Sequence, residues 1–249
     1  MAKKRLDQLL VERGLVETRS KAQAFIMAGN VFSGEQRLDK PGMPCKEDIS
    51  ITLRGQPHPW VSRGGLKLEK GLAEFEIDVT GFIGVDVGAS TGGFTDVLLQ
   101  NGAAKVYAVD VGQGQLDWKL RNDERVVVME KTNARHLTEE QISDAIDIVV
   151  CDASFIGLRT VLPASMERVK DGGYLIALIK PQFEVGKERV GKKGVVREPE
   201  LHQEVCDTIS DWLANLPGWE VLGITKSPIT GPEGNVEFLI CAFKSGGND

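Results

Sequence analysis

Between residues 82 and 180 the chain repeats one pattern, in which a short apolar run is followed by a stretch with helical character. The apolar runs lie at 82–87, 106–110, 126–129, 146–152 and 174–180, and helical stretches at 92–101, 114–121 and 157–169. Apolar strands that are buried on both faces and alternate with helices are typical of a doubly wound parallel sheet. The pattern therefore predicts an α/β domain with a Rossmann-like sheet.

The segment that follows extends the predicted sheet. A longer helical stretch covers 198–215, and two strand-like runs, 219–227 and 236–243, come after it with a loop between them. Two consecutive strands joined by a loop favour antiparallel pairing. We therefore expect an antiparallel edge pair beside the parallel strands.

The first 55 residues follow a different pattern. Helical spacing of leucines predicts a helix at 5–13, and a second helix begins at a Thr18 or Ser20 cap and stops at Gly29. Short strand-like pieces follow at 31–33 and 49–53. Two helices and a small sheet make a small α+β domain.

Two prolines within the four residues 56–59 are poor for a helix or a central strand and favour a linker. We predict three parts, a small N-terminal domain at 1–55, a linker at 56–61 and the α/β domain at 62–249.

Composition excludes several classes of protein. The chain is 41% hydrophobic with a net charge of −6, which does not fit a disordered chain. No apolar run approaches the ~20 residues of a membrane helix, and the basic N-terminus lacks the apolar stretch of a signal peptide. The four cysteines are widely separated, so no zinc site is predicted and a reducing, cytoplasmic location is expected.

Charge is unevenly distributed along the chain. Residues 1–60 carry three more basic than acidic side chains, whereas residues 61–249 carry nine more acidic than basic ones. The N-terminal part is therefore a candidate contact for a polyanion. An excess of this size is also common by chance, so charge alone leaves both interpretations open.

A glycine-rich turn follows the first apolar run of the α/β domain, where a strand ends and a helix begins. Such a turn lets a ligand approach the backbone closely, and the helix start offers free N–H groups. The turn matches neither GxGxxG nor a P-loop. Asp86, two residues before Gly88, instead favours a ligand with a positive charge, such as an amino-acid amino group. The candidate binding residues are Asp86, Gly88, Ala89, Ser90, Gly92 and Phe94.

Asp110 ends the next apolar run, 24 residues after Asp86. A carboxylate at this position can accept hydrogen bonds from both ribose hydroxyls of a nucleoside. An amino-acid end and a ribose together are features of S-adenosylmethionine. The alternative is a doubly wound domain whose acidic loop ends bind nothing.

Asp152 and Lys180 directly follow the fourth and fifth apolar runs. Ligands of open α/β sheets bind at the carboxyl ends of the strands, which makes both residues candidates. Asp152 could instead cap a helix, and Lys180 could be a solvated strand end. By composition alone Lys67 is a surface lysine and Glu237 an edge-strand charge. The basic loop 184–197 is either a lid that contacts phosphates or a solvated loop.

The motifs together resemble a known family. Arg5-Leu6-Asp7, Thr18-Arg19-Ser20-Lys21-Ala22 and Gly29-Asn30-Val31 resemble the RNA-binding domain named after ribosomal small-subunit protein four. The remainder is similar to ribosomal RNA 2′-O-methyltransferases of the FtsJ type. The combination resembles the TlyA family, through Ser62-Arg63-Gly64-Gly65, Asp86-Val87-Gly88-Ala89-Ser90-Thr91-Gly92-Gly93-Phe94, Asp110-Val111-Gly112, Cys151-Asp152-Ala153-Ser154-Phe155 and Lys180-Pro181-Gln182-Phe183-Glu184.

This resemblance implies a catalytic set that falls on Lys67, Asp152, Lys180 and Glu237. No metal is expected. The resemblance also implies S-adenosylmethionine as methyl donor and a ribose 2′-hydroxyl, of a cytidine, in ribosomal RNA as acceptor. Ribosomal RNA or ribosomal subunits are the expected partner, and no membrane is expected. The expected RNA contacts in the N-terminal domain are Lys4, Arg5, Arg19 and Lys21.

Two functions of other classes remain open at this point. The family is also described as hemolysin A, which would be a membrane-active protein, and the missing membrane span argues against it. The other is an RNA-binding module without catalysis, against which the glycine-rich turn and Asp110 argue.

Overall fold

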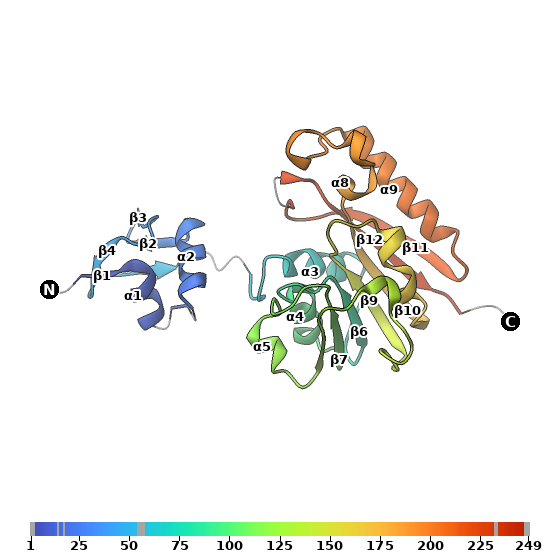
Figure 1. Ribbon diagram of the computed structural model, residues 1–249, viewed down its shortest axis with the longest axis horizontal. Helices are drawn as coiled ribbons and strands as arrows, with labels where there is room; N and C mark the ends of the chain where they lie inside the picture. The colour runs from blue at the N-terminus through green and yellow to red at the C-terminus, as the bar shows by residue number, and fades with distance from the viewer. Residues whose placement is uncertain (1–2, 14, 17, 54–57, 232–233, 247–249) are drawn as a thin grey trace. The chain divides into compact units, whose positions relative to one another are not determined.

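The chain divides into two compact units, Met1–Pro59 and Trp60–Asp249, and each is described by itself. The computed structural model describes residues 3–13, 15–16, 18–53, 58–231 and 234–246 (Figure 1). Two features expected from the sequence, the end of the first helix at Gly14 and the start of the linker at residues 56–57, lie outside these ranges.

The first unit packs two helices, α1 (Leu6–Glu12) and α2 (Arg19–Met27), around a small apolar core that includes Leu6, Leu10 and Ile26. The Thr18 side chain accepts a hydrogen bond from the Lys21 N–H, so Thr18 is the cap of the second helix. Two small sheets complete the unit. One pairs β1 (Lys3–Arg5) with β4 (Pro44–Lys46), and the other has the order β3 (Gln36–Arg37), β2 (Val31–Ser33), β5 (Thr52–Leu53).

The second unit contains a seven-stranded sheet, which confirms the predicted α/β class. Its order is β11 (Trp219–Lys226), β12 (Phe238–Lys244), β10 (Val169–Ile179), β9 (Ile146–Cys151), β6 (Ile83–Val87), β7 (Lys105–Val109), β8 (Val126–Met129). The five strands from β10 to β8 are parallel, and β11 and β12 form the expected antiparallel pair. The chain changes direction across the sheet between β6 and β9, the position where ligands of such sheets bind.

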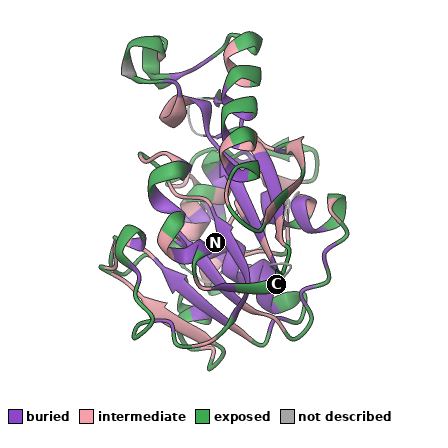
Figure 2. Cartoon of the chain, turned by 90° about the vertical axis from the view of Figure 1, so that its right-hand side faces the viewer, coloured by how far each residue is buried: buried purple, intermediate pink, exposed green. Residues whose placement is uncertain are grey.

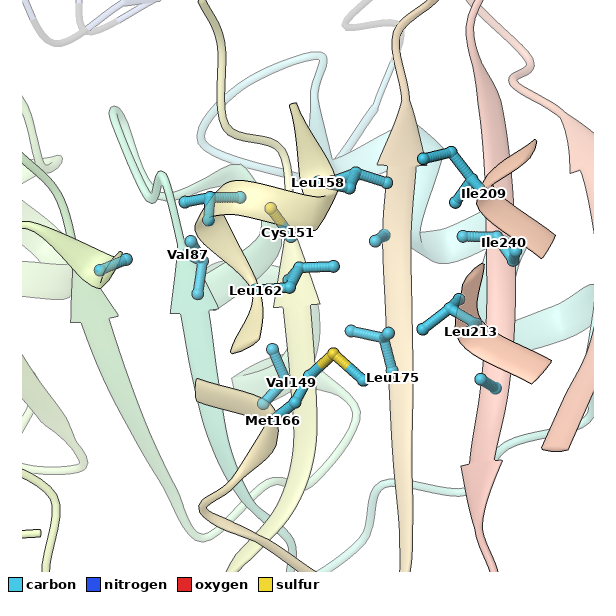
Figure 3. Packing of buried hydrophobic residues seen from close by; sticks show 14 of the residues in the cluster. Val87, Val149, Cys151, Leu158, Leu162, Met166, Leu175, Ile209, Leu213 and Ile240 are labelled. Carbon is cyan, nitrogen blue, oxygen red and sulfur yellow. The ribbon is translucent and has the colours of Figure 1, made fainter. Parts of the chain in front are cut away.

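Helices cover both faces of this sheet and form two apolar cores. One face carries α3 (Gly65–Glu74), α4 (Gly93–Gln100) and α5 (Trp118–Arg121), and the other carries α6 (Leu158–Val161), α7 (Pro163–Met166) and α9 (Pro199–Ala214). Figure 2 shows buried strands between helices that are exposed on their outer sides. In Figure 3, Ile209 and Leu213 of α9 pack beside Ile240 and Leu175 of the sheet.

Two helices were predicted with the wrong bounds. The helix expected at 114–121 is shorter, since α5 begins at Trp118. The expected helix at 157–169 is two helices of four residues each, with Pro163 at the first position of the second. Proline lacks the N–H that would continue the first helix. Strand β10 then begins at Val169, five residues before the predicted run at 174.

The register of the antiparallel pair decides which residues share an edge of the sheet. Ile179, the last residue of β10, pairs with Phe238, the first residue of β12. The residues that precede β12 therefore lie at the same edge as the carboxyl ends of the parallel strands. This register brings Glu237 to the edge where Asp152 and Lys180 follow β9 and β10.

Candidate active site

Four charged side chains from distant parts of the sequence form one chain of contacts at this edge. Lys67 Nζ lies 2.7 Å from Glu237 Oε2 and 3.2 Å from Asp152 Oδ2. Lys180 Nζ lies 2.6 Å from Asp152 Oδ1. Positive and negative groups alternate along this row of contacts, so the charges of the two lysines and the two carboxylates cancel. Buried charges are stable only when they are paired in this way.

The isolated interpretations of Lys67 and Glu237 from composition were wrong. Lys67 is 6% exposed rather than a surface lysine, because it points from α3 toward the sheet edge. Glu237 is 1% exposed, because β12 is covered by β11 and is an inner strand. Both the packing of α3 and the order of the strands depend on contacts between residues that are distant in the sequence. Composition gives no information on such contacts.

The glycine-rich turn brings its backbone against the segment that carries Asp152. Gly88 has a φ of 81°, and a Cβ there would lie 2.8 Å from the Cα of Ala153. Only glycine allows both the positive φ and this approach. Ser90 also has a positive φ, 48°, and its N–H donates to Asp110 Oδ2 at 2.7 Å.

Asp86 is buried beneath this turn with one oxygen satisfied. Its Oδ2 accepts hydrogen bonds from the Thr95 N–H and hydroxyl, at 3.0 and 2.7 Å. Its Oδ1 has no hydrogen-bond partner among the residues that the structure describes. Burial raises the pKa of this carboxyl to about 7, against the hydrogen bonds from Thr95, which lower it. An unpaired buried oxygen at a pocket wall is an acceptor for a ligand.

A pocket of about 240 Å³ joins the glycine-rich turn to the four charged residues. The predicted residues that line it are Lys67, Asp86, Gly88, Ala89, Ser90, Phe94, Asp152, Lys180 and Glu237. The other lining residues are Ser62, Arg63, Gly64, Thr91, Gly93 and Ser154. The two sets of residues that the sequence treated separately therefore share one cavity.

Two predicted binding residues are not part of this lining. Gly92 has a φ of 96° and faces the side chains of Leu116 and Leu120, so it shapes the start of α4. Asp110 Oδ1 accepts from the Gly112 N–H at 2.7 Å, and its Oδ2 holds Ser90. Asp110 thus fixes the conformation of the turn. Each of its oxygens keeps a second lone pair that can accept another hydrogen bond.

A short clamp beside the pocket was missed by the sequence analysis. Lys180 Nζ donates to Ser154 Oγ and to the Asp152 carbonyl, both at 2.9 Å. Glu184 Oε1 accepts from the Leu158 N–H, and burial raises the pKa of Glu184. Both clamp residues belong to one motif, Lys180 to Glu184, and they hold the segment 152–158 at two points.

Phe155 lies in the middle of this clamped segment. It is 90% exposed and has a φ of 66°, an unusual backbone conformation for a bulky residue. Its ring lies 5.2 Å from that of Phe183, centroid to centroid. Hydrophobic patterns in a sequence identify aromatic residues that are buried. They do not identify an exposed ring such as that of Phe155.

The expected RNA contacts of the first unit differ in their surroundings. Arg5 and Arg19 both bind the buried carboxylate of Asp7, at 3.0 and 2.9 Å, and each is about half exposed. These contacts hold the pKa of Asp7 well below its usual range. Lys4 instead pairs with Glu12 at 2.7 Å. Lys21 lies in the first turn of α2, where its N–H donates to Thr18.

Comparison with known proteins identifies both units. The S4 domain matches residues 4–48, and the FtsJ-like methyltransferase family matches residues 60–244. TlyA of Mycobacterium tuberculosis, a 16S/23S rRNA (cytidine-2′-O)-methyltransferase, is 46% identical over 95% of this chain and 88% of its own length. The chain belongs to the TlyA family. YqxC of Bacillus subtilis is 53% identical over 96% of this chain and 85% of its own.

Solved structures agree with this membership of the TlyA family. A hemolysin-type protein from Streptococcus thermophilus has a TM-score of 0.77 and 46% identity, covering 98% of this chain and 90% of that one. Among the described residues of this TlyA-family chain, no helix combines the length and apolar character needed to cross a membrane. The α/β unit is thus a methyltransferase domain, and the pocket lies where such a domain binds its ligands.

Proposed function

We propose that the protein transfers a methyl group from S-adenosylmethionine to the 2′-hydroxyl of a cytidine ribose in ribosomal RNA. The observation that carries this proposal is the balanced chain of Lys67, Asp152, Lys180 and Glu237 in one pocket with the unpaired oxygen of Asp86. The similarity to TlyA of Mycobacterium tuberculosis over most of both chains supports the choice of acceptor.

The residues of the pocket fit the proposed methyl donor. The buried Asp86 Oδ1 would accept a hydrogen bond from the donor's ammonium group, which is the partner that an orphaned carboxylate oxygen needs. The turn at 88–91 would hold the rest of the amino-acid part against its backbone. S-adenosylmethionine, when bound, supplies an electrophilic methyl group on a positively charged sulfur.

The four charged residues would prepare the acceptor hydroxyl. Lys180 Nζ is fixed by three acceptors, the Asp152 carboxylate, the Asp152 carbonyl and Ser154 Oγ. A group held at three points orients a hydroxyl with little loss of freedom at the moment of reaction. We assign Lys180 the role of orienting the 2′-hydroxyl and of stabilising, through its positive charge, the negative charge that develops on this oxygen as it takes the methyl group and its proton leaves to solvent.

The other three members would maintain this arrangement. Asp152 lies between the two lysines and holds both at once. Glu237 compensates part of the charge of Lys67, so Asp152 does not have to neutralise Lys67 alone and also pairs with Lys180. Removing one member would leave an uncompensated buried charge, which is costly.

The decisive experiment measures transfer of a labelled methyl group to ribosomal subunits purified from cells that lack this protein. Label in a cytidine ribose of the RNA supports the proposal, and label in another acceptor contradicts it. Binding of RNA without binding of S-adenosylmethionine would identify a non-catalytic module instead.

The first unit is expected to supply a large part of the RNA affinity. Arg5 and Arg19 present guanidinium groups that are already oriented by Asp7, which suits binding of phosphates. A protein truncated to residues 60–249 should bind the subunits at least about tenfold more weakly and with a shallower dependence on salt. Filter binding at several salt concentrations measures both quantities.

The control for this truncation is the affinity for S-adenosylmethionine, measured by calorimetry. The residues that line the pocket all lie in the second unit, so this affinity should be retained. An RNA affinity equal to that of the intact protein would show that the first unit has another role.

Phe155 is expected to stack on a base of the RNA near the reacting ribose. Its ring is exposed beside Ser154, which lines the pocket, and stacking of a base on an aromatic ring contributes about 1–3 kcal/mol. Phe155→Ala should raise KM for RNA by roughly tenfold, with little change in affinity for S-adenosylmethionine. Steady-state kinetics with Phe155→Trp as the conservative control tests this, since tryptophan should restore KM.

A further inference from the structure

A second pocket, of about 430 Å³, lies on the other face of the sheet, between the start of α9 and the adjoining ends of β11 and β12. It is lined by Arg197, Pro199, His202, Gln203, Cys206, Lys226, Val236 and Phe238. None of these residues lines the pocket that contains Lys180. The proposed chemistry therefore leaves this second pocket unexplained.

Both pockets open at the same edge of the sheet. Val236 and Phe238 line the second pocket, whereas Glu237 between them lines the first. Side chains alternate between the two faces of a strand, so the two pockets lie on opposite sides of the residues that enter β12. Lys226 ends β11 directly opposite Phe238 and so belongs to this edge as well. Successive residues of one segment, Val236, Glu237 and Phe238, therefore line the two pockets in turn.

The chemistry of the second pocket suits an anion. Its lining contains two cations, Arg197 and Lys226, and no carboxylate. Both are exposed, and neither charged group has a hydrogen bond or ion pair among the residues that the structure describes. The adjacent Glu198 carboxylate accepts the Arg197 backbone N–H. Backbone hydrogen bonds lower the pKa of Glu198, and the charges of Arg197 and His202 help to lower it, so this carboxylate partly offsets the positive charge beside the pocket. A carboxylate-free pocket is distinctive in residues 61–249, which carry nine more acidic than basic side chains.

Hydrogen bonds fix the segment that carries Arg197. Asn235 is 4% exposed, its side-chain oxygen accepts the Val196 N–H, and its amide donates to the Gly194 carbonyl. His202 Nε2 also contacts the Val196 carbonyl, at 2.9 Å. Because Asn235 lies two residues before Glu237, Arg197 is held at a defined distance from the proposed catalytic set.

We propose that this second pocket binds a backbone phosphate of the substrate RNA, next to the nucleotide whose ribose is methylated. Arg197 and Lys226 would contact the phosphodiester oxygens from the two sides of the pocket. The inference rests on the proposed function, and it assigns the end of the basic loop 184–197 to RNA binding. Such a contact would fix the path of the RNA strand and help to present the ribose to Lys180.

The test is the double variant Arg197→Gln, Lys226→Gln, compared with the double variant Lys170→Gln, Lys244→Gln. The second pair removes the same charge at the opposite edge of the sheet, from the start of β10 and the end of β12, where Lys170 pairs with Asp147 and Lys244 donates to the Val169 carbonyl. The probe is ribosomal subunits that lack the methyl group. We expect the first double variant to raise Kd and KM at least about tenfold, and to lower the slope of log K against log salt by about 1.

The turnover number at saturating RNA and the affinity for S-adenosylmethionine should stay near those of the unchanged protein. Arg197→Lys should recover most of the affinity, since a phosphate contact needs the positive charge. Thermal unfolding of each variant checks that the fold is retained, which the exposure of both side chains predicts.

The outcomes separate this inference from the proposed function. If the unchanged protein neither binds nor methylates the RNA, the proposed function fails. If it does both and the two double variants behave alike, whether both unaffected or both equally weakened, the second pocket is not an RNA-phosphate site and the inference is overturned.

Discussion

Replacing Lys180 with alanine should reduce methyl transfer by about a thousandfold, at the upper end of the range expected for loss of a positioned group that stabilises developing charge. The Nζ atom lies 2.6 Å from Asp152 Oδ1 and donates to two further acceptors, so it is held in one place at the pocket wall. Alanine keeps the backbone and removes the only group of this residue that reaches the acceptor site. Single-turnover transfer of a labelled methyl group measures the loss.

Cofactor binding separates a catalytic loss from a folding defect in this variant. Asp86 is held by Thr95 rather than by Lys180, so affinity for S-adenosylmethionine should change by less than about threefold in this variant. Lys170→Ala, near the start of β10, is the control and should remain active, although it removes the ion pair between Lys170 and Asp147. Near-normal transfer by Lys180→Ala would remove Lys180 from the mechanism.

The sheet could be predicted from the sequence because each strand and each helix is recognised from residues that are close together in the chain. Each apolar run and each following helix is visible within a few residues, and the strand order only had to obey known rules of doubly wound sheets. Asp152 and Lys180 could be placed at one edge for the same reason, since each directly follows an apolar run. The structure brings these two side chains to within 2.6 Å.

Burial and pairing of charges could not be predicted in this way. Lys67 and Glu237 are 170 positions apart, and only the packing of α3 and the inner position of β12 make them partners. The same holds for Asp7, which has no visible role in the sequence and yet orients Arg5 and Arg19. Family resemblance, rather than the residue pattern, supplied Lys67 and Glu237.

The binding of S-adenosylmethionine should depend on pH through Asp86. Burial raises the pKa of this carboxyl to about 7, so roughly half of the free protein carries it protonated at that pH. Protonation removes the negative charge that attracts an ammonium group and, because Oδ2 is held by the two Thr95 donors, places an O–H at Oδ1. The affinity should therefore be constant well above pH 7 and should fall about tenfold for each pH unit below it.

The raised pKa of Asp86 also means that its ionised form lowers the free energy of unfolding. The pKa in the folded protein lies above the unfolded value of 3.8, so the folded state binds more protons and stability decreases as pH rises from about 4 to 7. Above pH 7 the loss is complete and amounts to roughly 4 kcal/mol. Asp86→Asn should therefore raise the melting temperature of the ligand-free protein at pH 8, and should not raise it at pH 4.

The variant should lose binding while it gains stability. Asparagine can keep hydrogen bonds to Thr95, but it has no negative charge for an ammonium group, so affinity for S-adenosylmethionine should fall at least about a hundredfold. Calorimetric titrations at pH 5.5, 6.5 and 8 on both proteins measure the affinity and its pH dependence. A pH-independent affinity of the unchanged protein would show that another group binds the ammonium. A gain in stability with loss of binding is the combination that a merely structural Asp86 would not produce, because removing a structural carboxylate lowers stability.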